Sequence, residues 1–106
     1  MGSNENKKIE ELQILESHLQ HILAQKQGIQ VELNEVDNAI SEIKNAGEEV
    51  YKVVAGIMLK STAEKLNKEL EERKKTLDSK MNAVAKQEKL LEDKASELRT
   101  EIVGKA

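Results

Sequence analysis

Apolar residues recur along the first half of the chain in steps that alternate between three and four residues. This series starts at Leu12 and runs to Ile43, with Lys26 as its single polar member. Such alternation over several heptads is typical of a coiled-coil helix whose a and d positions form a seam. The pattern predicts a helix over about residues 8–45 that ends near Asn45-Ala46-Gly47. The predicted seam consists of Leu12, Leu15, Leu19, Ile22, Lys26, Ile29, Leu33, Val36, Ile40 and Ile43.

The second half of the chain carries the same pattern. Ser61-Thr62-Ala63-Glu64 fits a capping box with Ser61 as the N-cap, and a helix over about residues 62–103 is predicted to follow it. One row of leucines and a valine repeats every seven residues, and a second row follows it at steps of four. The two rows are Leu70, Leu77, Val84, Leu91 and Leu98, and Met81, Glu88, Ala95 and Ile102.

Between the two helical patterns lies a segment that is rich in β-branched residues and holds the only Tyr of the chain, Tyr51. Its composition predicts a β-hairpin over about residues 50–60 that turns near Ala55-Gly56. The fold class is therefore mainly α: an antiparallel two-helix coiled coil with a central β-hairpin, in a single domain over residues 1–106.

The register of the two helices follows from antiparallel pairing, because residues at one level then have numbers that add to about 110. This places Leu12 level with Leu98, and Lys26 within one layer of Glu88. Lys26 and Glu88 are the two polar interruptions of the seam, and we predict that they pair as a register device. The alternative is that the two side chains are tolerated independently, with their charged ends reaching water.

The hairpin segment is apolar on both faces in any register, and an isolated two-stranded hairpin is marginal in water. Its unpaired edges favour the addition of further strands. We therefore expect hairpins from several chains to join into a shared sheet or barrel, with the fold-back of the hairpin onto its own helices as the alternative. The predicted interface residues are Val50, Tyr51, Val53, Val54, Ile57, Met58 and Leu59.

The charge and composition exclude several classes of function. Acidic and basic residues are mixed along the chain and give a net charge of -3, so a nucleic-acid partner is not expected. With zero Cys, neither a disulfide nor a thiolate zinc site is possible. No apolar run is long enough to span a membrane and no targeting segment is recognisable, so a cytoplasmic protein is expected.

No motif for catalysis or cofactor binding stands out, and the sequence predicts no enzyme activity, no cofactor and no metal site. His18 and His21 are three residues apart on the first helix but lack a third ligand, and we interpret them as solvated. A few aliphatic residues near the two chain ends, Ile9, Ile14 and Val103, lie outside the seam rows. Leu90 also falls at an outward position. Such residues favour contact with exposed hydrophobic surface on another molecule, although single exposed aliphatics are common.

From about Leu12 to Leu98 the sequence resembles the prefoldin family, in particular the archaeal β-type subunits. Four segments, taken in this order and spacing, carry the resemblance. They are Gln25-Lys26-Gln27, the hairpin Val50–Lys60 with Gly56, the run Glu69–Leu77, and Lys86-Gln87-Glu88-Lys89.

The resemblance implies a hexamer of two α-type and four β-type subunits, whose hairpins form a β-barrel platform. It also implies ATP-independent capture of unfolded client proteins at the coiled-coil tips and their transfer to a group II chaperonin. The alternative is a structural coiled-coil adaptor that binds one defined partner. Under the prefoldin interpretation the client-binding tip consists of Ile9, Leu12, Ile14, Leu98, Ile102 and Val103.

Overall fold

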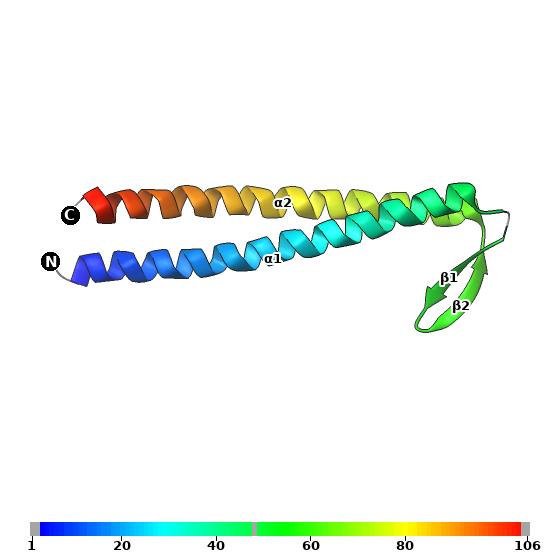
Figure 1. Ribbon diagram of the computed structural model, residues 1–106, viewed down its shortest axis with the longest axis horizontal. Helices are drawn as coiled ribbons and strands as arrows, with labels where there is room; N and C mark the ends of the chain where they lie inside the picture. Colours follow the sequence, from blue (N-terminus) through cyan, green and yellow to red (C-terminus); the bar gives the residue numbers. More distant parts are fainter. Residues whose placement is uncertain (1–2, 48, 105–106) are drawn as a thin grey trace. The chain divides into compact units, whose positions relative to one another are not determined.

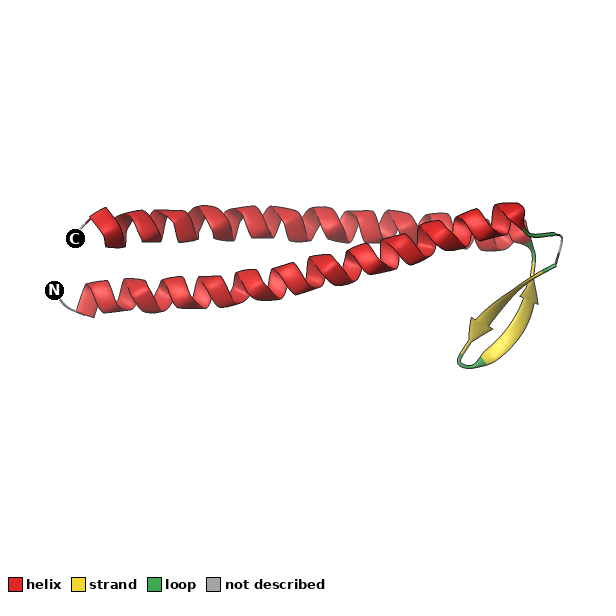
Figure 2. Ribbon diagram, in the orientation of Figure 1, coloured by secondary structure: helices red, strands yellow, loops and turns green. Residues whose placement is uncertain are grey.

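Two long helices and a two-stranded antiparallel hairpin make up the protein. The computed structural model describes residues 3–47 and 49–104, in the order α1 (Ser3–Asn45), β1 (Val50–Val54), β2 (Ile57–Ser61) and α2 (Ala63–Gly104). Helix dominates the described chain, and both strands come between the helices (Figure 2). The predicted mainly α fold with a central hairpin is confirmed. The single domain over residues 1–106 stays a prediction, and its residues 1, 2, 48, 105 and 106 lie outside the described part.

The chain divides into two compact units. The first, which we call the terminal unit, holds the described residues up to Gly28 and from Met81 onward. The second, the hairpin unit, runs from Ile29 to Lys80 and contains both strands. Within each unit, the segment of α1 runs antiparallel to the segment of α2 (Figure 1).

The heptad seam is confirmed in both units, because every predicted seam residue is buried or half-buried. In the terminal unit Leu15, Ala95 and Leu98 form a buried cluster, against which neighbouring seam leucines pack. In the hairpin unit Leu77 is the most fully buried large side chain, with 1% of its surface exposed. Burial of these aliphatic side chains at about 25 cal/mol per Å² is the main favourable term that holds the helices together.

The sequence pattern missed the first positions of one seam row on α2, Asn67 and Lys74, which are both half-buried. Asn67 lies seven residues before Lys74 and fourteen before Met81 on α2, in the same row as Glu88. Its Oδ1 atom is buried and has no hydrogen-bond partner. Burial of a polar residue at such a position is costly. Because Asn67 is polar, it does not belong to the apolar repeat from which the seam was predicted.

Ion pairs on the rim of the seam report the same antiparallel register. In the hairpin unit Arg73 Nη2 lies 2.6 Å from Glu32 Oε2, and Lys74 Nζ lies 2.9 Å from Asp37 Oδ1. The hydrogen bond to Asp37 and its negative charge raise the pKa of Lys74 above its ordinary value. Pairs of this kind contribute little to stability at exposed positions, but both join residues that the antiparallel alignment brings to nearly the same level.

Helix α1 begins at Ser3, five residues before the predicted start at about residue 8. The extra turn carries Glu5 in line with the seam, and Lys8 follows it in the other seam row, where an apolar pattern would not reveal them. Lys8 Nζ lies 3.2 Å from Glu101 Oε2 on α2. Polar contact therefore extends the paired helices beyond their last apolar layer.

The start of α2 corrects the predicted cap. Ser61 is the last residue of β2, and the side chain of Thr62 takes the capping role: its Oγ1 accepts a hydrogen bond from the backbone N–H of Lys65 at 3.2 Å. The backbone carbonyl of Thr62 also accepts from Leu66 N at 3.0 Å. The capping box predicted between Ser61 and Glu64 is thus wrong by one residue, because the cross-strand pairing of Ser61 with Val50 keeps Ser61 in the strand.

The hairpin turns at Ala55 and Gly56, as predicted, with Val54 paired to Ile57 on either side. Both turn residues have positive φ, 51° for Ala55 and 79° for Gly56. A two-residue loop with both φ values positive is the turn whose twist matches a β-hairpin. Gly56 suits this conformation, whereas the Cβ of Ala55 is strained by roughly 1 kcal/mol in the left-handed region.

Ala55→Asn is expected to stabilise the hairpin, because Asn tolerates the left-handed conformation and Asn-Gly is a preferred pair for this turn. Relief of about 1 kcal/mol corresponds to roughly five-fold slower hydrogen exchange of the strand amides. Exchange measured by mass spectrometry over residues 50–61 checks this. Ala55→Val is the control and is expected to speed exchange, since a β-branched residue fits positive φ worse than Ala. Equal rates in the two variants would contradict the assignment of strain to Ala55.

Candidate functional site: the hairpin and the helix ends

The hairpin exposes apolar side chains that a self-contained protein would bury. Of the seven residues that the sequence predicts as an interface, only Val50 is buried. The other six are exposed, with Val53 and Met58 at 67% each. They are Tyr51, Val53, Val54, Ile57, Met58 and Leu59.

The apolar side chains lie on both faces of the hairpin. Residues opposite each other in an antiparallel pair share a face. Val53 is opposite Met58, and these two define what we call the Val53 face. The other face carries Val54 opposite Ile57. A hairpin with exposed aliphatics on both faces has more apolar surface than its own helices cover.

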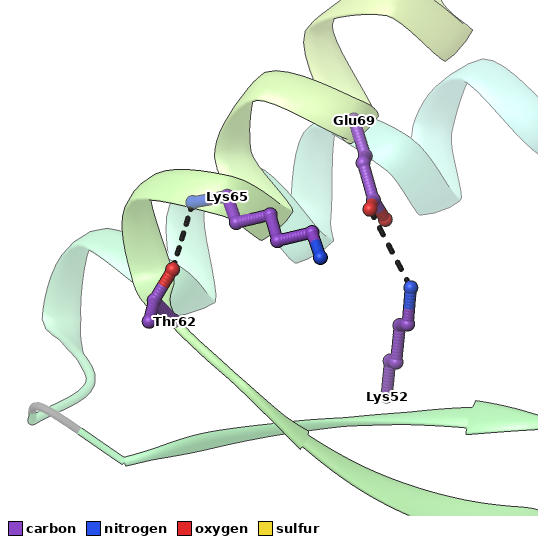
Figure 3. A network of polar contacts seen from close by, with 4 residues as sticks. All are labelled: Lys52, Thr62, Lys65 and Glu69. Carbon is purple, nitrogen blue, oxygen red and sulfur yellow. Dashed lines mark hydrogen bonds and ion pairs between the residues drawn. The ribbon is translucent and has the colours of Figure 1, made fainter.

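Polar contacts tie the base of the hairpin to the helices. Lys52 Nζ lies 3.4 Å from Glu69 Oε1 on α2, close to the Thr62 cap (Figure 3). Glu49, just before β1, accepts a hydrogen bond from Tyr51 Oη at 3.4 Å and lies 3.6 Å from Lys60 Nζ. These contacts fix the first residues of β1, whereas no described polar contact reaches the turn.

An apolar groove of about 840 Å³ opens between the hairpin base and the helices of the hairpin unit. Its lining comes from the end of α1, from both strands and from the first turns of α2, and includes Ile43, Val50, Met58, Leu66 and Leu70. Leu66 is buried although it lies outside the predicted seam rows. The hairpin and the helices thus form an apolar groove in addition to the seam between the helices.

The predicted tip residues fall into three groups in the terminal unit. Ile9, Ile14 and Val103 are exposed, Val103 to 73%. Leu12 and Ile102 are half-buried along the seam. Leu98 belongs to the buried cluster with Leu15 and Ala95, since it occupies a seam position. Its part in the client-binding tip stays a prediction.

The structure brings Lys26 and Glu88 together. Lys26 Nζ donates a hydrogen bond to Glu88 Oε1 at 2.9 Å, with 32% and 20% of the two side chains exposed. A second pair in the terminal unit joins Arg99 Nη2 to Glu16 Oε1 at 3.4 Å. The Lys26–Glu88 pair lies within the seam, and the role of a register device remains our proposal for it.

Two exposed apolar residues of α1 were missed by the sequence interpretation. Leu23 and Val31 are 48% and 55% exposed. Neither lies in the seam rows, and a tally of aliphatic residues outside positions a and d would have found both. Leu90, which the sequence placed at an outward position, is 70% exposed.

The described residues offer no obvious site for a metal ion. Among residues 3–47 and 49–104, no group of three or more His, Asp and Glu side chains is arranged to hold one. His18 and His21 are exposed, in line with their interpretation as solvated residues. Within the same residues, no helix is long and apolar enough to cross a membrane.

These features define a class of protein: a two-helix coiled coil interrupted by a two-stranded hairpin, with apolar surface exposed on the hairpin and near the chain ends. Comparison with known proteins supports this class and narrows it. A family model described as "Prefoldin subunit" matches residues 6–106. Since this covers almost all of the chain, the protein belongs to the prefoldin subunit family.

Individual relatives agree with the family match. Prefoldin subunit beta of Thermococcus kodakarensis is 37% identical over 94 residues, which is 87% of this chain and 80% of the relative. Prefoldin subunit beta of Caldivirga maquilingensis is 34% identical over 96 residues, covering 89% and 79% of the two chains. These archaeal relatives agree with the predicted resemblance to β-type subunits.

A solved structure supports the fold. The crystal structure of the prefoldin beta subunit from Thermococcus strain KS-1 has a TM-score of 0.89 and 34% sequence identity, and the match covers 95% of this chain and 90% of that chain. The chain is therefore a prefoldin chaperone subunit of the β type. Prefoldin subunits are chaperones and not enzymes, which agrees with the sequence prediction.

Proposed function

We propose that this subunit captures unfolded proteins with the exposed aliphatic residues near its chain ends and passes them to a group II chaperonin without ATP. The subunit acts within a cytoplasmic hetero-oligomer that contains an α-type prefoldin subunit, with two α-type and four β-type chains. The hairpins of neighbouring chains join into a β-barrel platform. The competing function is a structural adaptor that binds one defined partner.

The observation that carries this proposal is the exposure of Ile9, Ile14 and Val103 near the chain ends. The seam does not account for these residues, because none of them occupies an a or d position. Unfolded proteins differ from folded ones in exposing apolar side chains, so exposed aliphatics are a suitable general contact. Each contact is weak, and several arms that bind one client together provide useful avidity.

The hairpin supports the assembly part of the proposal. Six exposed apolar residues lie on a two-stranded hairpin, which is marginally stable alone. Pairing with strands of other subunits would cover this surface and satisfy the unpaired strand edges. Assembly in turn places several helix ends within reach of the same client.

The test replaces Ile9 and Val103, the exposed off-seam residues nearest to the two chain ends, with Ser. With an α-type partner supplied, we expect the double variant to need roughly ten-fold more complex to suppress the aggregation of an unrelated denatured protein. That factor corresponds to a loss of about 1.4 kcal/mol of binding free energy, which is reasonable for two aliphatic contacts. Light scattering measures the aggregation, and circular dichroism checks that helix content is unchanged.

The matched control is the double variant Leu90→Ser and Val31→Ser, which removes two exposed aliphatics elsewhere on the helices. It should suppress aggregation as well as the unsubstituted chain does. Equal losses in both variants would mean that the chain ends have no special role. If the unsubstituted complex fails to suppress aggregation at all, the adaptor function replaces the chaperone function.

A further inference from the structure

Methionine is the only source of oxidisable sulfur in this chain, because the sequence contains three Met and no Cys. The structure describes two of the three, Met58 in β2 and Met81 in α2. A peroxide converts the apolar thioether of Met into a polar sulfoxide. Since the chain has no thiol to compete for the oxidant, the accessibility of these two side chains decides which of them is oxidised first.

Met58 is far more accessible than Met81. On the hairpin, Met58 is 67% exposed, whereas Met81 is half-buried in the seam between the helices. Met58 also lines the apolar groove of the hairpin unit, and the groove volume of about 840 Å³ is many times that of a water molecule. Hydrogen peroxide is only slightly larger than water, so it reaches Met58 both from bulk solvent and through the groove.

Met58 also lies on the face of the hairpin that the proposed assembly covers. It is opposite Val53, and side-chain alternation places Tyr51 and Lys60 on the same face. Tyr51 Oη and Lys60 Nζ both lie next to the carboxylate of Glu49, at 3.4 Å and 3.6 Å. The Val53–Met58 pair is apolar and exposed, and a thioether suits such a site because it is flexible and makes favourable apolar contacts.

We propose that Met58 is a modification site at which oxidation by a peroxide blocks the assembly of this subunit with its partners. The thioether sulfur gives an electron pair to one peroxide oxygen, and the O–O bond breaks. With hydrogen peroxide the products are methionine sulfoxide and water, so the sulfur is oxidised and the peroxide is reduced by two electrons each. This inference rests on the proposed assembly through the hairpin and adds a chemical condition under which that assembly fails.

The sulfoxide opposes assembly because its oxygen is a hydrogen-bond acceptor in an apolar place. Val53, the residue opposite Met58, has no side-chain donor for it. When strands of neighbouring subunits cover this face, the oxygen is removed from water, and burial of an unpaired polar group is costly. We expect the apparent affinity for an α-type subunit to fall at least ten-fold, which corresponds to about 1.4 kcal/mol.

Oxidation and assembly compete for the same face of the hairpin. A free subunit exposes Met58 to the oxidant, whereas a subunit whose Val53 face is covered is protected. The modification therefore acts on unassembled subunits and leaves existing complexes intact. It is also reversible, because methionine sulfoxide reductases return the sulfoxide to the thioether.

The test treats the full chain with hydrogen peroxide, alone or after assembly with an α-type subunit, and locates the sulfoxides by peptide mass spectrometry. In the free chain we expect Met58 to be oxidised at least five-fold faster than Met81, and at least five-fold faster than Met58 in the complex. Native mass spectrometry then measures the assembly of the oxidised chain with fresh α-type subunit. Circular dichroism checks that the helices persist, and treatment with methionine sulfoxide reductases should restore assembly.

Two variants assign the effect to one sulfur atom. Met58→Leu and Met81→Leu are each compared with their own untreated sample, so that any effect of the substitution itself on assembly cancels. Peroxide should lower the assembly of Met81→Leu as strongly as that of the unsubstituted chain, and should not change the assembly of Met58→Leu. Both variants retain Met1, so oxidation at the first residue affects them equally.

The remaining outcomes separate this inference from the proposed function. A chain that carries the sulfoxide at position 58 and still assembles with unchanged affinity would overturn the inference and leave the proposed assembly in place. A loss of assembly that peroxide also causes in Met58→Leu would overturn it too, because another residue would then be responsible. If the untreated chain does not assemble with an α-type subunit, the proposed function itself fails and the inference fails with it.

Discussion

Val53→Asp is expected to abolish assembly with an α-type subunit while leaving both helices of the chain folded. Val53 is 67% exposed and lies opposite Met58, which is equally exposed, on the same face of the hairpin. If neighbouring strands cover this face, the new carboxylate is removed from water with no partner cation. Such burial costs several kcal/mol for each subunit, and the cost recurs wherever hairpins meet.

Native mass spectrometry or size-exclusion chromatography of the mixed subunits measures the loss of assembly, and circular dichroism follows the helices. The matched control is Val31→Asp, which places the same charge at an exposed β-branched residue of α1 in the same unit. The control should assemble normally. A Val53→Asp chain that still forms the full hetero-oligomer would show that this face remains in solvent, and the barrel platform would have to be abandoned.

Much of the fold could be predicted from the sequence because a heptad repeat indicates both which residues of a helix are buried and which residues of the other helix they face. Leu15 and Ala95 are buried in one cluster because their steps of three and four keep them on the facing sides of two antiparallel helices. The hairpin could be located because β-branched residues concentrate around Ala55-Gly56. Its exposure could be inferred as well, since no single register hides Val53 and Val54 together.

The errors arose where polar groups decide the structure. Ser61 and Thr62 are both good N-caps, and only the strand pairing of Ser61 with Val50 assigns the cap to Thr62. The start of α1 carries polar residues such as Glu5 and Lys8 in line with the seam, which no apolar repeat reveals.

The candidate surfaces could be predicted only in part, for a related reason. Seam residues can be recognised because they recur in a heptad repeat. Exposed apolar residues such as Leu23 follow no repeat, so the sequence pattern does not single them out. A single exposed aliphatic carries little information, because much of any protein surface is apolar.

The pairing of Lys26 with Glu88 leads to the second large effect. Lys26→Met alone is expected to lower the free energy of unfolding by roughly 1–2 kcal/mol, because the carboxylate of Glu88 then lies in the seam, 20% exposed, without its cation. Adding Glu88→Leu should restore the stability of the unsubstituted chain or exceed it, since apolar residues can replace a partly buried ion pair without loss. Thermal unfolding at fixed protein concentration, followed by circular dichroism, measures both effects.

The double variant also tests why two charged residues occupy an apolar seam. If the pair sets the register, the chain that combines Lys26→Met with Glu88→Leu keeps its stability but gains access to shifted alignments of the helices. Disulfide crosslinking between Cys residues introduced in place of Leu19 and Leu91, which pack against the same cluster, detects such a shift as slower or incomplete bond formation. A coupling energy near zero between the two substitutions, with unchanged crosslinking, would indicate two independently tolerated side chains. A coupling of about 1 kcal/mol or more, together with impaired crosslinking, would establish that the polar layer is retained for alignment rather than for stability.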